Sequence, residues 1–241
     1  MVNVIFEIAR KEWLSYFTGR MSLMRNLIML AVFSILPIMQ IDAVMKATSY
    51  DAGIVGQALE TYLLFSSMYA VVMGATIAVM AFPYEKEMRT IEYLFSLPLK
   101  DGEIFAGKAL AAIAAGLGGL AFVMSVIAGY VLVLNGHLIQ WTASFPTLSL
   151  LLTALVIAPM IVVLSVLVIV AVSGFISSVR ATYMPTYLIA GGIIGLSFAK
   201  YGLGIDVLLI DAVIIGVLAA GIIVTFAVAL KTFNRERIVS N

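Results

Sequence analysis

Six long apolar blocks constrain this chain more than any other feature of its sequence. Each is long enough to cross the hydrocarbon core of a bilayer, which takes about 20 residues of helix. The blocks are continuously apolar rather than alternating, so a closed β-barrel is excluded and each block is predicted to be a membrane-spanning helix. The predicted spans lie near residues 26–44, 62–83, 107–134, 148–173, 183–199 and 207–230.

The composition agrees with this prediction. Of 241 residues, 63% are hydrophobic and only 11% are charged, which is too little charge to cover the surface of a soluble domain of this length. The chain has no cysteine, which excludes disulfides, thiolate metal sites and cysteine nucleophiles. We therefore expect an all-α integral membrane protein with one transmembrane domain over residues 1–241.

The positive charges predict the orientation of the chain. With six spans, 12 of the 14 lysines and arginines fall on one side of the membrane, and only Lys46 and Lys200 fall in loops on the other. Basic residues concentrate in cytoplasmic loops. Both termini and the loop between the second and third spans are therefore expected in the cytoplasm. Glu60 is expected in the outer loop with Lys46, and no acidic group is expected at the middle of a span.

Residues 1–20 show a different pattern, in which apolar residues such as Ile5, Ala9, Trp13 and Tyr16 recur at three- and four-residue intervals. This spacing predicts an amphipathic helix lying flat at the cytoplasmic interface of the membrane, with Trp13 and Tyr16 at the depth of the lipid headgroups. The alternative is a frayed cytoplasmic extension.

The stretch GEIFAGKA, residues 102–109, resembles the phosphate-binding P-loop in its spacing. A P-loop requires a hydroxyl side chain after its lysine, a preceding strand and a soluble α/β domain. Ala109 stands at the hydroxyl position and a predicted span follows it, so this segment is not expected to bind nucleotide. Gly102 is expected in a turn, and Lys108 is expected to reach toward the membrane surface from the third span.

The segment 84–101 just before it has the pattern of a short charged helix. Met88, Ile91, Leu94 and Phe95 share one face, the charged residues occupy the others, and Pro98 ends the helix. A charged amphipathic helix between two spans on the cytoplasmic side predicts a docking element for a soluble partner. The alternative is a solvated loop.

This loop resembles that of the membrane subunits of type-2 ATP-binding-cassette (ABC) exporters. The family pattern reads approximately E-x-E-x-G-T-[IL]-E-x-L-L-[ST]-x-P-[VL], followed after a short gap by E-[IL]-x-x-G-K. Arg89 stands where the family usually has glycine, and Phe95 replaces a common leucine. The matching residues are Glu85, Glu87, Thr90, Ile91, Glu92, Leu94, Ser96, Pro98, Leu99, Glu103, Ile104, Gly107 and Lys108.

The resemblance implies a function and a set of partners. It implies a permease subunit of an exporter in a prokaryotic plasma membrane, which pairs with a second permease copy or a related permease. The chain itself would not be an enzyme and would hold no cofactor, since ATP and Mg²⁺ would bind to a separate ATPase subunit. The segment 84–101 would be the coupling helix that docks on that subunit. Its implied contact residues are Glu85, Glu87, Arg89, Thr90, Glu92, Leu94, Phe95, Leu97 and Pro98.

Other functional classes have less support. An ion-gradient-driven secondary transporter or channel is the main alternative, but such proteins usually have ionisable groups at the middle of their spans. The only histidine, His137, has no clustered metal ligands near it in sequence. Glycines in the third span and the G-x-x-x-G formed by Gly191 and Gly195 indicate close helix contacts, either within the subunit or between subunits.

Overall fold

The structure, a computed structural model, describes residues 2–85, 88, 101–139, 145–173, 178–202 and 206–232. None of these residues forms a β-strand. Six helices are long and apolar enough to cross a membrane, at Met21–Ala47, Ala52–Tyr84, Gly102–Leu134, Leu148–Ser173, Val179–Gly202 and Val207–Ala229. The predicted all-α membrane fold with six spans is therefore confirmed.

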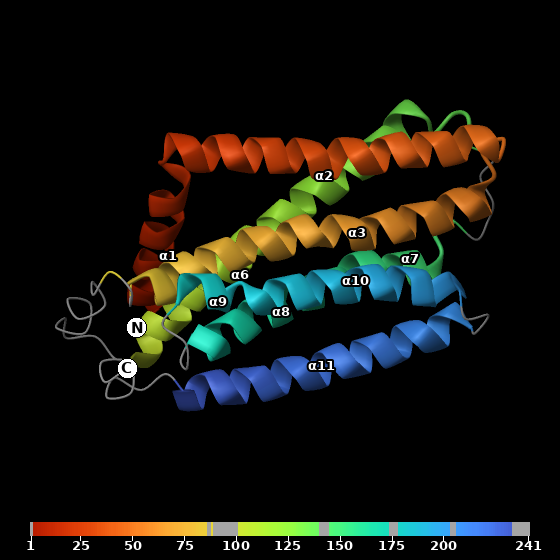
Figure 1. Cartoon of the computed structure of the whole chain (residues 1–241). Helices are drawn as coiled ribbons and strands as arrows, with labels where there is room; N and C mark the ends of the chain where they lie inside the picture. The colour runs from red at the N-terminus through yellow and green to blue at the C-terminus, as the bar shows by residue number, and fades with distance from the viewer. Residues whose placement is uncertain are drawn as a thin grey trace.

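The chain begins with helix α1 (Val2–Phe17), which crosses the end of the bundle at a steep angle to α2 (Arg20–Ala47), as Figure 1 shows. We call this end of the bundle the α1 end and the opposite one the far end. The predicted N-terminal segment is thus helical. Phe6 and Trp13 are exposed, as an interfacial helix requires. Its place at a membrane surface stays a prediction.

Tyr16, by contrast, is buried within the protein. Its ring is 4% exposed, and its hydroxyl donates a hydrogen bond to Asn26 Oδ1 (2.9 Å) while accepting one from Arg25 Nη2 (3.1 Å). Tyr16 therefore joins α1 to the start of α2 inside the protein and does not turn its ring toward lipid, while its depth in the membrane stays a prediction.

A tight turn leads from α2 into α3 (Ala52–Val79) at the far end. Ser49 and Tyr50 have positive φ values of 52° and 61°, and the Asp51 side chain caps α3 by accepting a hydrogen bond from the Ile54 N–H (3.0 Å). Because the turn is so short, α3 begins ten residues before the predicted span at 62. Glu60 consequently lies inside a helix and not in a loop.

Helix α3 forms the centre of the bundle, and it packs against α2, α6 (Asp101–Ala128), α8 (Ala158–Ser173) and α10 (Met184–Gly202). It continues at the α1 end into a π-helical turn, η1 (Met80–Tyr84). Close packing of α3 on α6 depends on small residues. A Cβ atom added to Gly116 would lie 2.6 Å from Val162 Cγ1 and 3.1 Å from the Ala70 carbonyl oxygen.

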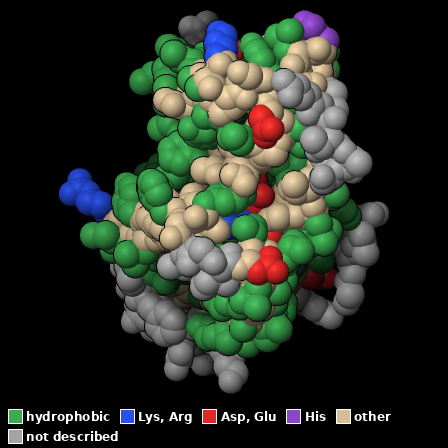
Figure 2. Space-filling view, turned by 90° about the vertical axis from the view of Figure 1, so that its right-hand side faces the viewer, with side chains coloured by type: hydrophobic (Ala, Val, Ile, Leu, Met, Phe, Trp, Pro, Cys, Tyr) green, Lys and Arg blue, Asp and Glu red, His purple; other side chains and the backbone are tan. Residues whose placement is uncertain are grey.

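The remaining helices complete the bundle. Helix α6 ends in the π-helical turn η2 (Gly129–Leu134), and α7 (Leu148–Leu152) continues through η3 (Thr153–Ile157) into α8. A short helix, α9 (Val179–Thr182), precedes α10 at the α1 end, and α11 (Val207–Thr232) runs back from the far end (Figure 1). In Figure 2, which looks onto the far end, hydrophobic side chains dominate and charged ones are scattered.

The helices extend beyond the predicted spans at several points. Helix α6 begins at Asp101, so Gly102 lies in its first turn and not in the expected loop turn. Helix α10 continues to Gly202, three residues past the predicted end of its span, and it therefore includes Lys200. The prediction that Lys200 lies in an outer loop is wrong.

Candidate functional site

The structure contains two candidate sites, one at each end of the bundle. The first surrounds Lys108 at the α1 end. Its Nζ atom lies 2.6 Å from Glu85 Oε2, 2.6 Å from the Ala81 carbonyl oxygen and 3.5 Å from Glu12 Oε1. The side chain is 1% exposed, so the expectation that it reaches toward the membrane surface is wrong. Lys108 instead ties α6 to both η1 and α1.

The packing around Lys108 explains the sequence that resembled a P-loop. Residues 102–109 form continuous α-helix, with Ile104 fully buried. A Cβ atom added to Gly107 would lie 2.8 Å from Ile8 Cβ and 3.0 Å from the Ile5 carbonyl oxygen. Gly107 is therefore the point where α1 approaches the α6 backbone, and Lys108 is the adjacent ionic tie. The G-K pair has a structural role here.

Only part of the predicted coupling segment belongs to the described residues. Tyr84 and Glu85 end the helical run of α3 and η1, Met88 is 57% exposed, and Asp101 begins α6. The segment thus connects two helices whose adjoining ends are held together by the Glu85–Lys108 ion pair. Eight of its nine predicted contact residues lie outside the described residues, namely Glu87, Arg89, Thr90, Glu92, Leu94, Phe95, Leu97 and Pro98.

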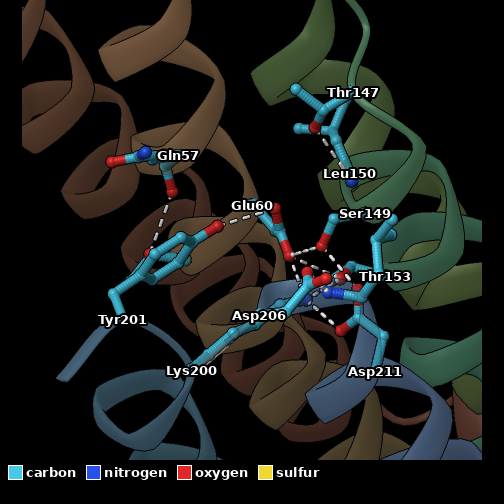
Figure 3. A network of polar contacts seen from close by, with 12 residues as sticks. Gln57, Glu60, Thr147, Ser149, Leu150, Thr153, Lys200, Tyr201, Asp206 and Asp211 are labelled. Carbon is cyan, nitrogen blue, oxygen red and sulfur yellow. Dashed lines mark hydrogen bonds and ion pairs between the residues drawn. The ribbon is translucent and has the colours of Figure 1, made fainter. Parts of the chain in front are cut away.

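The second candidate site is a buried polar network toward the far end, drawn in Figure 3. Its three charged members are Glu60 on α3, Lys200 on α10 and Asp211 on α11, which are 2%, 1% and 0% exposed. Lys200 Nζ forms ion pairs with Glu60 Oε1 and Asp211 Oδ1. It also donates a hydrogen bond to Thr153 Oγ1 (2.8 Å).

Hydroxyl groups complete this network. Tyr201 donates a hydrogen bond to Glu60 Oε2 (2.7 Å), and Thr153 donates one to Glu60 Oε1 (3.0 Å). Ser149 Oγ lies 2.7 Å from Glu60 Oε1 and 2.5 Å from Asp211 Oδ2. The network therefore joins α3, α7, η3, α10 and α11. Removing one partner from such a buried charge cluster is costly, since an uncompensated charge remains.

This network was not predicted because its three charged residues lie toward the far ends of their helices, where charge normally meets water. Glu60 and Lys200 were expected in loops, and Asp211 lies near the start of the predicted sixth span at 207–230. The network is buried within the bundle, although its charges lie toward the ends of the helices and not at their middles. The available signal was a lysine in a predicted loop on the side with few basic residues, together with the acidic Glu60 and Asp211.

Some of the glycines singled out in the spans contact other helices of this chain, and others have open space around them. Gly116 and Gly119 face α3 within the subunit, and a Cβ atom on Gly119 would lie 2.8 Å from Met73 Sδ. Cβ atoms on Gly118, Gly191 and Gly195 would meet no atom within 4 Å. His137 is exposed in the turn that follows η2. No group of three or more metal-ligating residue types gathers within the ranges that the structure describes.

Comparison with known proteins identifies the family. The family model described as ABC-2 family transporter protein matches residues 6–205, which include most of α1, residues 84–101 and the first five helices that could span a membrane. No curated protein matches this chain. The matched range includes both Lys108 and Glu60, so both candidate sites lie wholly or partly within it.

Proposed function

Because the chain belongs to the ABC-2 family of transporter membrane subunits, we propose that it is the permease of an ABC exporter, driven by a separate ATPase subunit that docks on residues 84–101. The family is one of multi-pass permeases that have no ATPase site of their own and work with an ATPase partner. The proposed parts are the docking segment, the direction of transport, the pairing with a second permease and the orientation in the membrane.

The observation that carries the proposal is the Glu85–Lys108 tie. Residues 84–101 connect the end of η1 to the start of α6, and the ion pair (2.6 Å) holds these two ends together. A force applied to the segment would therefore act on α3 and α6 jointly. Since α3 is the central helix of the bundle, ATP-driven movement of a docked subunit could rearrange the whole bundle through this one connection.

The charge distribution supports a cytoplasmic α1 end. Exposed basic residues at this end include Arg10 and Lys11 on α1 and Arg180 on α9. At the far end, Lys46 is paired with Asp42 (2.6 Å) and Lys200 is buried in its ionic network. Both far-end lysines are therefore neutralised by acidic partners. Unpaired positive charge is concentrated at the α1 end even more strongly than the numbers of lysines and arginines at the two ends indicate, as expected for a cytoplasmic face. We therefore infer that both termini lie in the cytoplasm, and the resemblance to the exporter family implies a prokaryotic cell.

We propose pairing with a second permease because one face of α10 is not covered by other helices of this chain. Gly191 and Gly195 form a small-residue stripe with no atom of this chain within 4 Å of an added Cβ. Such stripes allow close contact with another transmembrane helix. The partner would be a second copy of this chain or a related permease, and ATP and Mg²⁺ would bind to the ATPase subunits.

One observation supports the alternative of an ion-gradient-driven carrier or channel, namely the buried charges of the far-end network. The family match nevertheless favours the ABC permease, because it extends through the coupling segment. Site-specific photo-crosslinking separates the two. A photoreactive residue in place of Met88 should form an adduct with the ATPase subunit that co-purifies with the chain, whereas one in place of His137 should not. Adducts at neither position, or at both equally, would contradict the proposed docking site.

A further inference from the structure

Two carboxyl groups of the far-end network reach the same hydroxyl group. Ser149 Oγ lies 2.7 Å from Glu60 Oε1 and 2.5 Å from Asp211 Oδ2, as Figure 3 shows. A serine hydroxyl has a single hydrogen and can donate it to only one acceptor at a time. If both carboxyl groups were ionised, one of these two contacts would bring together two oxygen atoms with no hydrogen between them.

No other hydrogen of the network is available to fill that contact. The Lys200 ammonium group has three hydrogens and three oxygen neighbours, namely Thr153 Oγ1, to which it donates a hydrogen bond, and the ion-paired Glu60 Oε1 and Asp211 Oδ1. The hydroxyl hydrogens of Thr153 and Tyr201 are both donated to Glu60. The network therefore has one polar contact more than its side chains have hydrogens to donate when Glu60 and Asp211 are both ionised.

The charges give the same result independently. Glu60 and Asp211 together carry two negative charges if ionised, and Lys200 is the only positive charge that contacts them among the described residues. All three side chains are at least 98% buried. Burial of an uncompensated charge is strongly unfavourable, because the charge loses its hydration and the protein interior does not make up for that loss. One additional proton removes both the excess charge and the missing hydrogen.

The geometry also identifies which carboxyl group holds that proton. Glu60 accepts hydrogen bonds at both of its oxygens, from Thr153 at Oε1 and from Tyr201 at Oε2. Asp211 Oδ2 contacts only Ser149 Oγ among the described residues. A proton on Asp211 Oδ2 can be donated to Ser149 Oγ, which then donates its own hydrogen to Glu60. Every contact then contains a hydrogen, and the proton sits on the less crowded oxygen, because Glu60 Oε1 already faces Lys200, Thr153 and Ser149.

We propose that this network is a proton-binding site, in which one proton held by Asp211 completes the polar contacts that join α11 to α3, α7 and α10. The titratable groups that face Asp211 are Glu60 from α3 and Lys200 and Tyr201 from α10, while α7 and η3 contribute Ser149 and Thr153. When the proton leaves, two carboxylates oppose each other across Ser149. The proton therefore determines how firmly α11 is held at the far end. This site does not depend on the proposed docking of an ATPase.

Infrared spectroscopy of the purified full chain in lipid nanodiscs tests the assignment directly. The protein is prepared with carboxyl-¹³C-labelled aspartate, so that aspartic acid bands move and glutamic acid bands do not. At neutral pH we expect a protonated-carboxyl C=O band that moves with the label, is lost in Asp211→Asn and is retained in Asp206→Asn. Asp206 is the matched control, since it lies exposed at the start of the same helix.

Three results would overturn the proposal: no label-sensitive band at neutral pH in the wild type, a band that persists in Asp211→Asn, and a band that is insensitive to the label but is lost in Glu60→Gln. The last result would place the proton on the other carboxyl group.

Thermal unfolding across pH provides a second test that needs no spectroscopic assignment. The folded chain binds a proton that the unfolded chain releases near neutral pH, so the stability must fall as pH rises. The unfolding equilibrium constant should increase by about tenfold per pH unit over the range in which the folded chain keeps the proton. In Asp211→Asn the amide N–H replaces the acid proton, so this part of the pH dependence should vanish. A wild type with a flat profile would contradict the proposal even if the variant failed to fold.

Discussion

Lys108 and Glu85 join the two helices that flank the proposed coupling segment, with Nζ and Oε2 2.6 Å apart and the lysine side chain almost completely buried. The residues are 23 positions apart in sequence, so the ion pair joins the two helix ends that the segment connects. A partner that docks on this segment would therefore act on two helices that the ion pair holds together.

This tie predicts the effect of Lys108→Met. The substitution removes the buried ammonium group that faces Glu85 and Glu12, and breaking a buried ion pair from one side costs on the order of 3–5 kcal/mol. Lys11→Met is the control, since Lys11 contacts the same Glu12 from an exposed position and exposed pairs contribute about 1 kcal/mol or less. Thermal unfolding in detergent should show a large decrease in stability for Lys108→Met only. Equal losses would contradict the structural role of Lys108.

A second prediction concerns the contact between α1 and α6. Gly107→Ala places a methyl group 2.8 Å from the Ile8 side chain and 3.0 Å from a backbone oxygen, so α1 must move. Overpacking of this kind costs about 1–3 kcal/mol. Gly118→Ala, on the same helix with open space around it, should be neutral or stabilising by up to about 1 kcal/mol because alanine favours helix. The two effects are compared by measuring the midpoint of thermal unfolding of each variant.

Should Gly107→Ala be as stable as Gly118→Ala, α1 would not pack on α6 as described. A free α1 would then be the better interpretation of the N-terminal segment, which was predicted to lie at the membrane surface.

A third prediction addresses orientation in the membrane. The chain has no cysteine, so single cysteines can be labelled selectively. In intact cells, an impermeant thiol reagent should label cysteines introduced at Lys46 and His137, which are exposed at the far end, and should not label one at Lys11. Lys200 is unsuitable for this measurement because it is buried. Labelling at Lys11 but at neither far-end position would reverse the proposed orientation.

A fourth prediction concerns nucleotide. The purified chain alone should show no saturable ATP binding, because residues 102–109 form a helix packed against α1 and not a phosphate-binding loop. Equilibrium binding of a labelled ATP analogue measures this, with a P-loop ATPase as the positive control. Saturable binding that Ala109→Ser strengthens would contradict this interpretation of the segment.

The sequence predicted the spans well because a membrane span is a local property. A run of about 20 apolar residues needs no knowledge of its neighbours to be identified. Positions that depend on tertiary contacts were not predictable in the same way. Lys108 was expected at the membrane surface because a lysine at the end of a span usually reaches water. Only the packing of η1 and α1 around it shows why this lysine is buried.

The far-end network escaped prediction for a related reason. Glu60, Lys200 and Asp211 come from three helices that are distant in sequence, and each charge looks like the boundary of its own span. Their burial follows from the bundle, in which the positive charge of Lys200 makes the interior tolerable for Glu60 and Asp211. A single sequence contains the charges but not their pairing.

The central claim is that residues 84–101 couple this permease to an ATPase, and one comparison tests it most directly. The double variant Glu87→Lys and Glu92→Lys reverses two charges of the segment, and loss of a buried charge contact at an interface costs on the order of 2–5 kcal/mol. The variant should still insert, since neither residue belongs to a predicted span. A matched control reverses Glu7, an exposed acidic residue of α1 outside the segment.

The measurement is the yield of the ATPase subunit that co-purifies with the permease, together with its ATP turnover in the complex, at equal membrane levels of each variant. We expect the double variant to lose the ATPase subunit or to uncouple its turnover from transport, while Glu7→Lys behaves like the wild type. If yield and turnover are both unchanged in the double variant, residues 84–101 are not the coupling element.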